Sequence, residues 1–240
     1  MSDHIIKIDN LNYTIDNTII LKNINAEIRE GIITGILGPN GCGKTTMLRI
    51  LSGLLEHNNQ GLVSKEFYNS GFIFQNVEQN LIPWKTVYEN IVLSVANVNV
   101  DIDSIDKKVT ALLNEFSIED LKFKFPNQLS GGQKQIISLI RWFVLPIDLL
   151  FIDEGWTMLD ILQKEKIHEL IRKINYQNKT TILMVSHNIE DLSILCQEVF
   201  LMSPSPGRIL EKIELNNDYV SNSNLLWSKA KKEFHTTLEV

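Results

Sequence analysis

The sequence predicts an α/β fold, in which buried parallel strands alternate with helices. Continuous apolar runs at residues 33–37, 148–153 and 181–186 are typical of strands that are covered on both faces of a sheet. Segments with helical spacing of apolar residues lie between these runs. A glycine-rich turn at 38–46 also joins the first run to a helix-like stretch. These observations together favour a parallel sheet with helices on both of its faces.

An antiparallel sheet is expected before this core. Residues 4–13 and 18–28 show mixed alternation of polar and apolar side chains, which suits two antiparallel strands. A turn at Glu30 and Gly31 follows them. Tyr13 ends the first strand, either as a half-buried strand aromatic or as a platform for a flat base.

The glycine-rich turn reads GPNGCGKTT and contains the spacing G-x-x-x-x-G-K-T. Gly38, Gly41 and Gly43 can adopt backbone angles that residues with a Cβ avoid. Inward N–H groups and the N-terminus of the next helix would then cradle phosphate oxygens. Lys44 is placed to reach the outer phosphates, and the Thr45 hydroxyl can bind Mg²⁺. A chance glycine-rich turn is the alternative, but the flanking strand and helix favour the phosphate site.

A mostly helical block is expected at about 86–145, inserted in the α/β core. Its candidate helices are 87–95, 104–116 and 136–145. A short buried strand at 71–74 precedes it, whereas the polar stretch 55–70 receives no firm assignment.

The remaining segments continue the alternation of strands and helices. The sequence predicts one domain over residues 1–215 and a polar tail over 216–240. The expected elements are strand 148–153, helix 161–175, strand 181–186, helix 189–195, strand 198–202, strand 209–215 and a short helix at 224–234.

Composition narrows the functional classes. The net charge is −6 over 240 residues and no long basic block occurs, which argues against a nucleic-acid partner. Two cysteines, Cys42 and Cys196, favour a reducing compartment over a disulfide framework. Cys42 lies in the glycine loop, either as a small residue that fits there or as a reactive thiol. We expect no signal peptide and no membrane span, so any membrane role needs a partner.

Polar residues end several of the predicted core strands. Asp153 and Glu154 follow one buried strand, Gln75 follows a second and His187 a third. Strand ends of a parallel sheet meet at one edge, so these groups can converge on a bound phosphate. Asp153 can hold the Mg²⁺ shell, and Glu154 can take a proton from an attacking water. A single polar residue at a strand end is more often a solvent-exposed residue without a function. The combination of these residues is what indicates a phosphate site.

The stretch LSGGQ, residues 129–133, opens a helix. Its backbone N–H groups and Ser130 can form an anion site. Because the glycine loop already holds one side of the phosphates, we expect this site to cap ATP bound by a second subunit. A head-to-tail pair of chains would enclose two ATP molecules.

These motifs resemble those of the ATP-binding-cassette ATPases, the nucleotide-binding subunits of ABC transporters. GPNGCGKTT looks like Walker A, LSGGQ like the family signature and LLFIDE like Walker B. The resemblance covers residues 4 to about 213. It implies a P-loop NTPase (RecA-like) core, an N-terminal antiparallel β subdomain and an inserted α-helical subdomain, with ATP and Mg²⁺ as cofactors.

The resemblance also assigns expected roles. Glu154, His187, Gln75 and Lys44 are the expected catalytic residues, and Thr45, Gln75 and Asp153 the expected metal ligands. The residues expected to bind the nucleotide are Tyr13, Gly38, Pro39, Asn40, Gly41, Cys42, Gly43, Lys44, Thr45, Thr46, Ser130, Gly131, Gly132, Gln133 and Asp160.

Within the family, the chain is most similar to bacterial importers of the nitrate, sulfonate and taurine group. The cues are GCGKTT, FIFQ, LIPWKTVYENI and a PGRI turn. This implies ATP-driven import through an integral membrane permease, a second ATPase subunit, an external solute-binding protein and a cytoplasmic place on the inner face of the cell membrane. An exporter subunit or a non-transport ATPase of the same family is the alternative. Trp84 is either an anchor for the permease or a packing residue of the helical block.

Three positions depart from the family pattern. Gly155 replaces the usual proline after Glu154, Met158 replaces a small residue and Ile136 replaces an arginine. None of them removes a phosphate, metal or proton-transfer group, so we expect an active ATPase.

Overall fold

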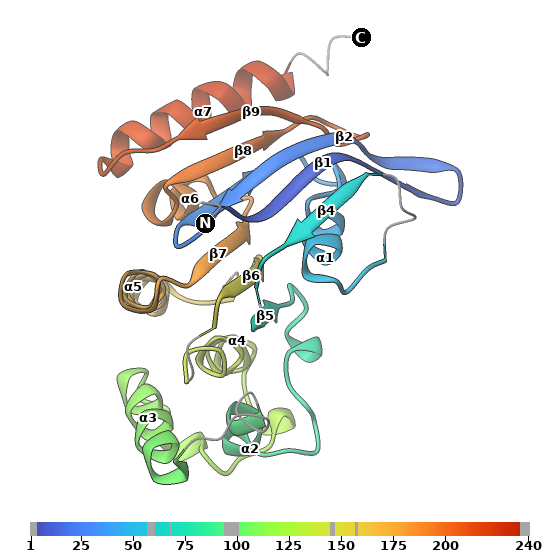
Figure 1. The fold of residues 1–240 in the computed structure, drawn as a ribbon. Helices are drawn as coiled ribbons and strands as arrows, with labels where there is room; N and C mark the ends of the chain where they lie inside the picture. Colours follow the sequence, from blue (N-terminus) through green and yellow to red (C-terminus); the bar gives the residue numbers. More distant parts are fainter. Residues whose placement is uncertain are drawn as a thin grey trace.

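The computed structural model describes residues 4–56, 61–67, 69–93, 101–144, 147–156 and 158–235. Within them, two sheets and a set of helices form an α/β architecture (Figure 1). One sheet has the strand order β5-β6-β7-β3-β8-β9, and the other has the order β2-β1-β4. The predicted fold class is confirmed.

The strands are β1 (His4–Ile15), β2 (Thr18–Arg29), β3 (Ile33–Leu37), β4 (Leu62–Lys65), β5 (Ser70–Ile73), β6 (Leu149–Asp153), β7 (Thr181–Val185), β8 (Glu198–Met202) and β9 (Ile209–Glu214). The helices are α1 (Lys44–Ser52), α2 (Val87–Val92), α3 (Ile102–Glu115), α4 (Gly131–Ile140), α5 (Ile161–Asn178), α6 (Ile189–Leu195) and α7 (Tyr219–His235).

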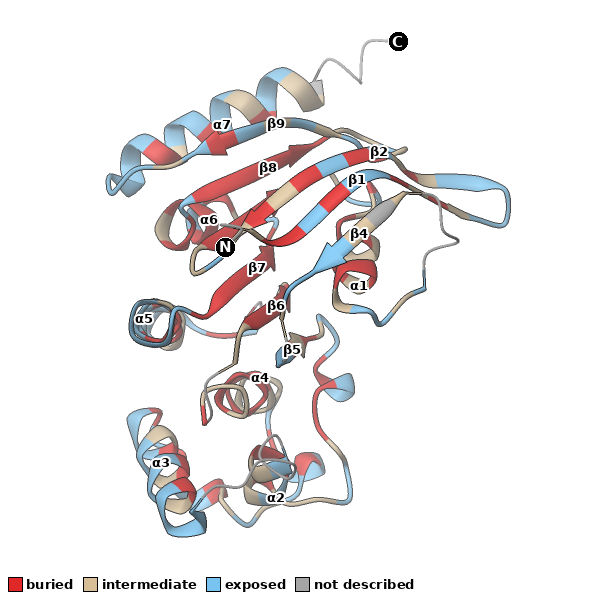
Figure 2. Cartoon of the chain, in the orientation of Figure 1, coloured by how far each residue is buried: buried red, intermediate tan, exposed pale blue. Residues whose placement is uncertain are grey.

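The larger sheet is the core of the molecule. Strands β5, β6, β7, β3 and β8 pair in parallel, and β9 pairs antiparallel to β8. All five residues of β3, β6 and β7 are buried, as their continuous apolar runs predict. Figure 2 shows β6 and β7 in the colour of buried residues. The carboxyl ends of β3, β5, β6 and β7 therefore share one edge, where the polar strand-ending residues lie.

The smaller sheet lies over one face of the core. Strands β1 and β2 pair antiparallel, with Ile6 opposite Ile28 and Tyr13 opposite Leu21. Strand β4, which the sequence did not reveal, pairs with the other edge of β1. It has four residues in a polar stretch, so its pairing depends on the neighbouring strand rather than on its own pattern.

Two apolar cores separate the layers. Helix α1 packs between the two sheets, where Met47 and Leu48 meet Ile36 and Phe151. On the other face, α4, α5 and α6 contribute to a second core. The main sheet is thus covered on both faces, which positions its carboxyl edge as a fixed rim.

The helical subdomain contains α2, α3 and α4 and lies at the bottom of Figure 1. Thr86 and Glu89 form a capping box at the start of α2, and Ser130 and Gln133 form another at the start of α4. Helix α4 begins at Gly131 with Ser130 as its cap, which confirms the expectation that LSGGQ opens a helix. The helix expected at 136–145 is therefore the later part of α4, and it ends sooner than predicted, at Ile140.

Helix α7 packs against α6 and includes the short helix expected at 224–234. Leu226 and Ala230 are buried, and Asn222 donates a hydrogen bond to the Ser193 carbonyl of α6 at 3.3 Å. The proposed division at residue 215 stays a prediction.

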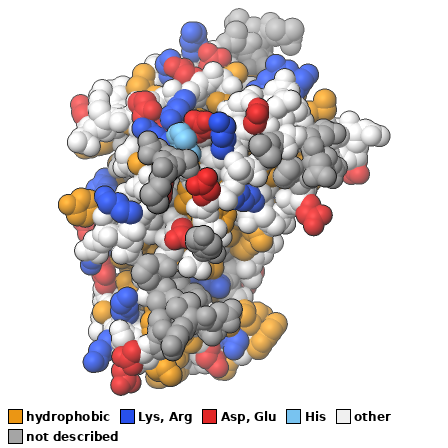
Figure 3. All heavy atoms as spheres, viewed as in Figure 1, with side chains coloured by type: hydrophobic (Ala, Val, Ile, Leu, Met, Phe, Trp, Pro, Cys, Tyr) orange, Lys and Arg blue, Asp and Glu red, His pale blue; other side chains and the backbone are white. Residues whose placement is uncertain are grey.

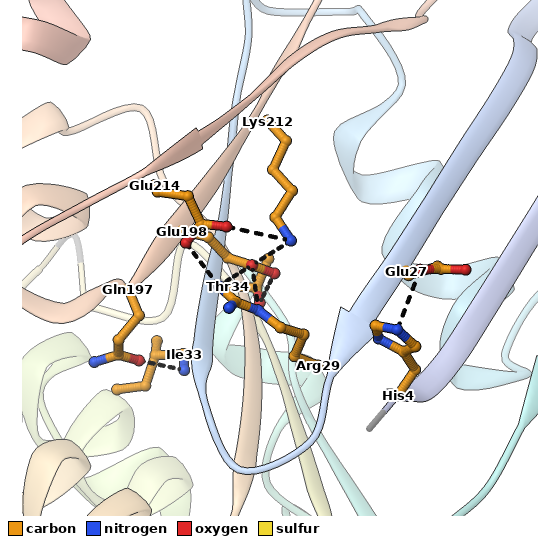
Figure 4. Close-up of polar contacts among 9 residues, drawn as sticks. All are labelled: His4, Glu27, Arg29, Ile33, Thr34, Gln197, Glu198, Lys212 and Glu214. Atoms are coloured by element: carbon orange, nitrogen blue, oxygen red, sulfur yellow. Dashed lines mark hydrogen bonds and ion pairs between the residues drawn. The ribbon is translucent and has the colours of Figure 1, made fainter. Parts of the chain in front are cut away.

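A buried charge cluster links the two sheets (Figure 4). The Glu198 side chain on β8 is fully buried, and its Oε2 lies 2.6 Å from Nη2 of Arg29 on β2 and 2.7 Å from Nζ of Lys212 on β9. Its Oε1 accepts a hydrogen bond from the Thr34 hydroxyl at 3.0 Å. The carboxylate is therefore both paired and hydrogen-bonded, which is the condition under which a buried charge is tolerated.

We expect Glu198→Ala to destabilise the fold by about 3 kcal/mol, because a fully buried side chain is removed and the buried Thr34 hydroxyl loses its acceptor. Arg29 and Lys212 are each about one third exposed and still pair with Glu214, so the lost charge pairs contribute less. Thermal unfolding should show a midpoint lower by roughly 6–12 °C. Glu214→Ala is the control, since its side chain is 60% exposed although it also contacts Arg29; it should shift the midpoint by less than about 3 °C. Equal shifts in both variants would contradict the role of burial.

Charges of both signs share the surface. Figure 3 shows Lys and Arg side chains among Asp and Glu side chains on the face that carries β1 and β4.

Candidate functional site

A cleft of about 580 Å³ lies at the carboxyl edge of the main sheet. It brings together the loop after β3 with residues that follow β5, β6 and β7. The lining residues are Ile20, Asn40, Gly41, Gly43, Lys44, Thr45, Thr46, Gln75, Glu154 and His187. Polar groups from four separate segments therefore converge as the sequence predicts.

The loop between β3 and α1 has the backbone that its glycines permit. Gly43 has φ +100°, and a Cβ there would approach Leu21 Cδ2 to 2.8 Å. Helix α1 begins at Lys44 without a side-chain cap. Its first N–H groups therefore remain available for an anion, and the helix dipole favours negative charge at this end.

Lys44 is held inside this loop. Its Nζ donates hydrogen bonds to the carbonyls of Gly38 at 2.8 Å and Pro39 at 3.0 Å. The side chain is buried apart from the surface that it adds to the cleft. The loop thus holds the positive charge of Lys44 at the wall of the cleft, beside the place where a phosphate would bind.

Thr45 and Asp153 form the oxygen-rich side of the site. The Thr45 hydroxyl donates to Asp153 Oδ1 at 3.0 Å. Burial raises the pKa of Asp153, the Thr45 hydrogen bond opposes this, and the charge of Glu154 raises the pKa further. A cation beside Asp153 would relieve this unfavourable burial of negative charge.

These residues fit Mg²⁺ in the manner of nucleotide sites. The described residues contain no group of three or more His, Cys, Asp or Glu side chains that could hold a metal. Mg²⁺ commonly uses only one or two protein oxygens together with substrate phosphates and water. The hydroxyl of Thr45 and the carboxylate of Asp153 meet that requirement.

Glu154 lies where β6 ends and faces two other strand-ending residues. Its Oε2 accepts a hydrogen bond from Gln75 Nε2 at 2.8 Å, and its Oε1 lies 3.2 Å from His187 Nδ1. Its backbone has φ +52°, a left-handed conformation that costs a non-glycine residue about 1–2 kcal/mol. A sharp turn therefore directs this carboxylate into the cleft.

Gly155 fits this turn better than proline would. A Cβ at position 155 would approach Ile152 Cγ2 to 2.9 Å. A proline also confines the preceding residue to extended conformations, which excludes the positive φ of Glu154. The departure from the family pattern therefore has a structural reason in this chain.

We expect Gly155→Pro to lower the turnover number for ATP hydrolysis by about tenfold, because it would displace Glu154 from the cleft. Steady-state phosphate release measures this effect, and ATP affinity should change little. Gly155→Ala should have a smaller effect, since it adds the Cβ without the proline ring. An equal or higher turnover in the proline variant would refute the structural reason given above.

The signature residues lie outside this cleft. Ser130 and Gln133 cap α4, with the Gln133 backbone N–H donating to Ser130 Oγ at 3.3 Å. Asp160 caps α5 by accepting a hydrogen bond from the Gln163 backbone at 2.9 Å. None of the residues from Ser130 to Gln133 lines the cleft, and neither does Asp160. A single chain therefore does not gather all the residues expected to bind ATP.

The segment before Asp160 contacts the signature helix. The Met158 backbone N–H donates to Gln135 Oε1 at 2.8 Å. The Met158 side chain covers Gly131, where a Cβ would come within 2.6 Å of its sulfur. The departure at Met158 thus places a long side chain directly over the LSGGQ turn.

Tyr13 does not line the cleft. It is 8% exposed and belongs to the core between the sheets, so it is more deeply buried than the half-buried strand aromatic of one interpretation. Its role as a platform for a flat base stays a prediction. Ile20, near the start of β2, lines the cleft instead. The sequence offered no signal for Ile20, because its position depends on how the β1–β2 hairpin lies over the glycine loop.

The remaining loop residues support the loop from behind. Gly38, Pro39 and Cys42 do not line the cleft. Burial raises the pKa of the Cys42 thiol, and the side chain is fully buried. Cys42 is therefore the small buried residue of the two readings, not a reactive thiol.

A phosphate-binding loop between a buried strand and α1, facing strand-ending acids, defines a P-loop nucleoside triphosphatase. The chain belongs to the ABC transporter family, whose sequence model matches residues 21–157. It is an ATPase of that family, with ATP as its nucleotide.

Two proteins that are similar to this chain in sequence are named as ATP-binding proteins of importers. The taurine import ATP-binding protein TauB of Escherichia coli O157:H7 is 30% identical over 203 residues, covering 82% of this chain and 79% of that protein. The aliphatic sulfonates import ATP-binding protein SsuB of Bacillus thuringiensis subsp. konkukian is 31% identical over 210 residues, covering 85% and 81%. The predicted resemblance is confirmed.

Solved structures share the fold. A dimeric ATP-binding cassette in a post-hydrolysis state with ADP and Pi has a TM-score of 0.77 and 27% identity, covering 88% of this chain and 99% of that one. The cbiO1 protein of Clostridium perfringens, part of the ABC transporter complex cbiONQ, has a TM-score of 0.75 and 27% identity, covering 100% and 96%.

Proposed function

We propose that this chain is the ATP-hydrolysing subunit of an importer for a small organic or anionic solute of the taurine, sulfonate or nitrate type. The convergence of Lys44, Glu154 and His187 on one cleft supports this proposal most strongly. The similarity to import subunits for taurine and sulfonates supports the direction of transport and the class of solute.

The charged and polar side chains at the phosphate end of the site have proposed roles. Lys44 and the N-terminus of α1 bind the β- and γ-phosphates. Thr45, Asp153 and Gln75 hold Mg²⁺, which would neutralise charge on the phosphates. Glu154 accepts the proton of the attacking water, while His187 and Gln75 orient the groups around the γ-phosphate.

The active form is a head-to-tail pair of chains. Ser130, Gly131, Gly132 and Gln133 lie at the start of α4 and away from the cleft of their own chain. A second copy that docks head to tail would place them on the outer side of ATP. Asp160 and the exposed Met158 would lie near the same interface. The dimeric state of a similar cassette supports this arrangement.

The membrane partner is an integral permease, and the chain lies on the cytoplasmic face. No helix of the described residues is long and apolar enough to cross a membrane. Trp84 follows Pro83 in the segment between Gln75 and α2, and 76% of it is exposed. Such exposure favours its reading as an anchor for a partner over that of a packing residue. An external solute-binding protein would deliver the solute.

We expect Trp84→Ala to reduce assembly with the permease at least about tenfold, because an exposed aromatic anchor would be lost. Co-purification from membranes measures assembly, and ATP hydrolysis by the isolated subunit should be unchanged. Trp227→Ala, on α7, is the matched control with an exposed tryptophan elsewhere. Normal assembly of the Trp84 variant would remove this residue from the interface.

Affinity isolation of the tagged protein from its native membranes tests the whole proposal. A small permease together with an anchored solute-binding protein would support import, and that binding protein could then be screened with taurine, alkanesulfonates and nitrate. A larger permease without a binding protein would favour an exporter. Soluble or nucleic-acid partners alone would overturn the transport function and leave the ATPase activity intact.

A further inference from the structure

Trp156 is a buried aromatic residue two positions after Glu154. It is 3% exposed, and its indole N–H donates a hydrogen bond to Asp191 Oδ2 at 2.9 Å. Its ring meets the His168 imidazole edge-on, with the centroids 5.6 Å apart. These contacts tie the segment after β6 to α6, which carries Asp191, and to α5, which carries His168.

Asp191 joins these groups at the centre of the cluster. His168 Nε2 lies 3.3 Å from Asp191 Oδ1, within ion-pair distance but without hydrogen-bond geometry. Burial raises the pKa of Asp191, but the imidazole of His168 and the indole of Trp156 outweigh it and leave the pKa below its ordinary value. The buried carboxylate is thus stabilised as an anion, and as an anion it is a strong acceptor for the indole N–H.

We propose that Trp156 is a positioning residue for ATP hydrolysis: its hydrogen bond to Asp191 fixes the orientation of Glu154 relative to His187. This inference rests on the proposed role of Glu154 as the proton acceptor. The bond joins two short segments, since Trp156 follows Glu154 by two residues and Asp191 follows His187 by four. Restraining both segments through one buried bond restrains the 3.2 Å approach of Glu154 Oε1 to His187 Nδ1.

The backbone around Glu154 makes such an anchor necessary. Gly155 has no side chain and permits more backbone conformations than the usual proline. Glu154 itself holds a strained positive φ, which persists only where the surroundings impose it. The Glu154 side chain contacts Gln75 and His187, and both partners lie on exposed loops. Two buried contacts also restrain this turn: the Glu154 backbone N–H donates to the Val185 carbonyl at 3.1 Å, and the indole of Trp156 donates to Asp191. The first holds the backbone of Glu154 itself, and the second holds the segment that follows it.

A small cavity lies between the Trp156–Asp191 pair and the Glu154–His187 pair. Its volume is about 90 Å³, and Glu154, His187, Trp156 and Asp191 contribute to its walls. The cluster of Trp156, His168 and Asp191 therefore lies behind Glu154 and His187, which line the nucleotide cleft. Movement of the indole would open or close this space and would change the position of the Glu154 carboxylate.

Four variants test the inference. Trp156→Phe keeps a ring and removes the N–H donor. We expect its turnover number to fall about tenfold while the KM for ATP stays within about twofold, because the phosphate cradle does not touch Trp156. Asp191→Asn keeps an oxygen acceptor for the indole N–H and should retain most of the wild-type turnover. Asp191→Leu should match Trp156→Phe, and combining these two changes should cause no further loss.

The controls separate this inference from the function on which it rests. Glu154→Gln in the same assay should abolish turnover, and Trp227→Phe on α7 should leave it unchanged. The positioning role would be overturned if the wild type hydrolyses ATP, Glu154→Gln does not, and Trp156→Phe has the same turnover as the wild type. A Trp156→Phe variant that only melts earlier, with wild-type turnover well below its melting temperature, would do the same. Absence of turnover in the wild type, or an unaffected Glu154→Gln, would instead overturn the proposed site.

Discussion

Glu154→Gln should lower steady-state ATP hydrolysis at least about 100-fold while leaving ATP binding intact. The amide has nearly the shape of the carboxylate but cannot accept the proton of an attacking water. In the structure the carboxylate lies between Gln75 Nε2 and His187 Nδ1, so an amide can occupy the same place with little disturbance. Phosphate release under saturating ATP measures the loss.

The same variant should accumulate as an ATP-bound dimer, because closure would no longer be reversed by hydrolysis. Light scattering on the protein with and without ATP detects the change in mass. Glu165→Gln, an exposed glutamate on α5, is the charge-matched control and should behave as the wild type. Unchanged hydrolysis in Glu154→Gln would refute the assignment of the proton acceptor.

Lys44→Ala should weaken ATP binding by about 10- to 100-fold, because a charge-assisted hydrogen bond to phosphate contributes about 1.5–3 kcal/mol. The variant also removes the donor that joins the carbonyls of Gly38 and Pro39 across the loop. Equilibrium binding of a fluorescent ATP analogue measures the change. Hydrolysis at saturating ATP should fall as well, since the charge on the outer phosphates would be less well stabilised.

Comparison with Glu154→Gln separates the two roles. Lys44→Ala should lose affinity, whereas Glu154→Gln should lose turnover and keep affinity. Lys173→Ala, which removes an exposed lysine on α5, is the control for a change in net charge. Wild-type affinity in Lys44→Ala would mean that the loop binds phosphate through its backbone alone.

Much of the fold could be predicted because its core strands carry their own signal. The runs that became β3, β6 and β7 are apolar throughout, and the structure buries each of them. The glycine loop and the acids after β6 were identifiable for a similar reason, since local chemistry sets their conformation. Strand β4 was not, because its pairing with β1 determines it rather than its own pattern.

The site likewise contains residues that the local sequence predicts and residues that only tertiary contacts bring into place. Its polar residues follow predictable strand ends, but Ile20 enters through the placement of a whole hairpin. The contact of Trp156 with Asp191 joins residues 35 positions apart, and neither residue alone suggests it. Tyr13 had two readings from sequence, and only the packing of the two sheets shows that it is buried.

The carboxylate of Glu198 has a consequence for how the molecule unfolds. Its cationic partners come from β2 of the smaller sheet and β9 of the larger one. Detachment of the smaller sheet would strip one partner from a carboxylate that remains in the protein interior, so partial unfolding along this boundary is disfavoured. We therefore expect the two sheets to unfold together, so that Ile20 stays at the wall of the cleft for as long as the core is folded.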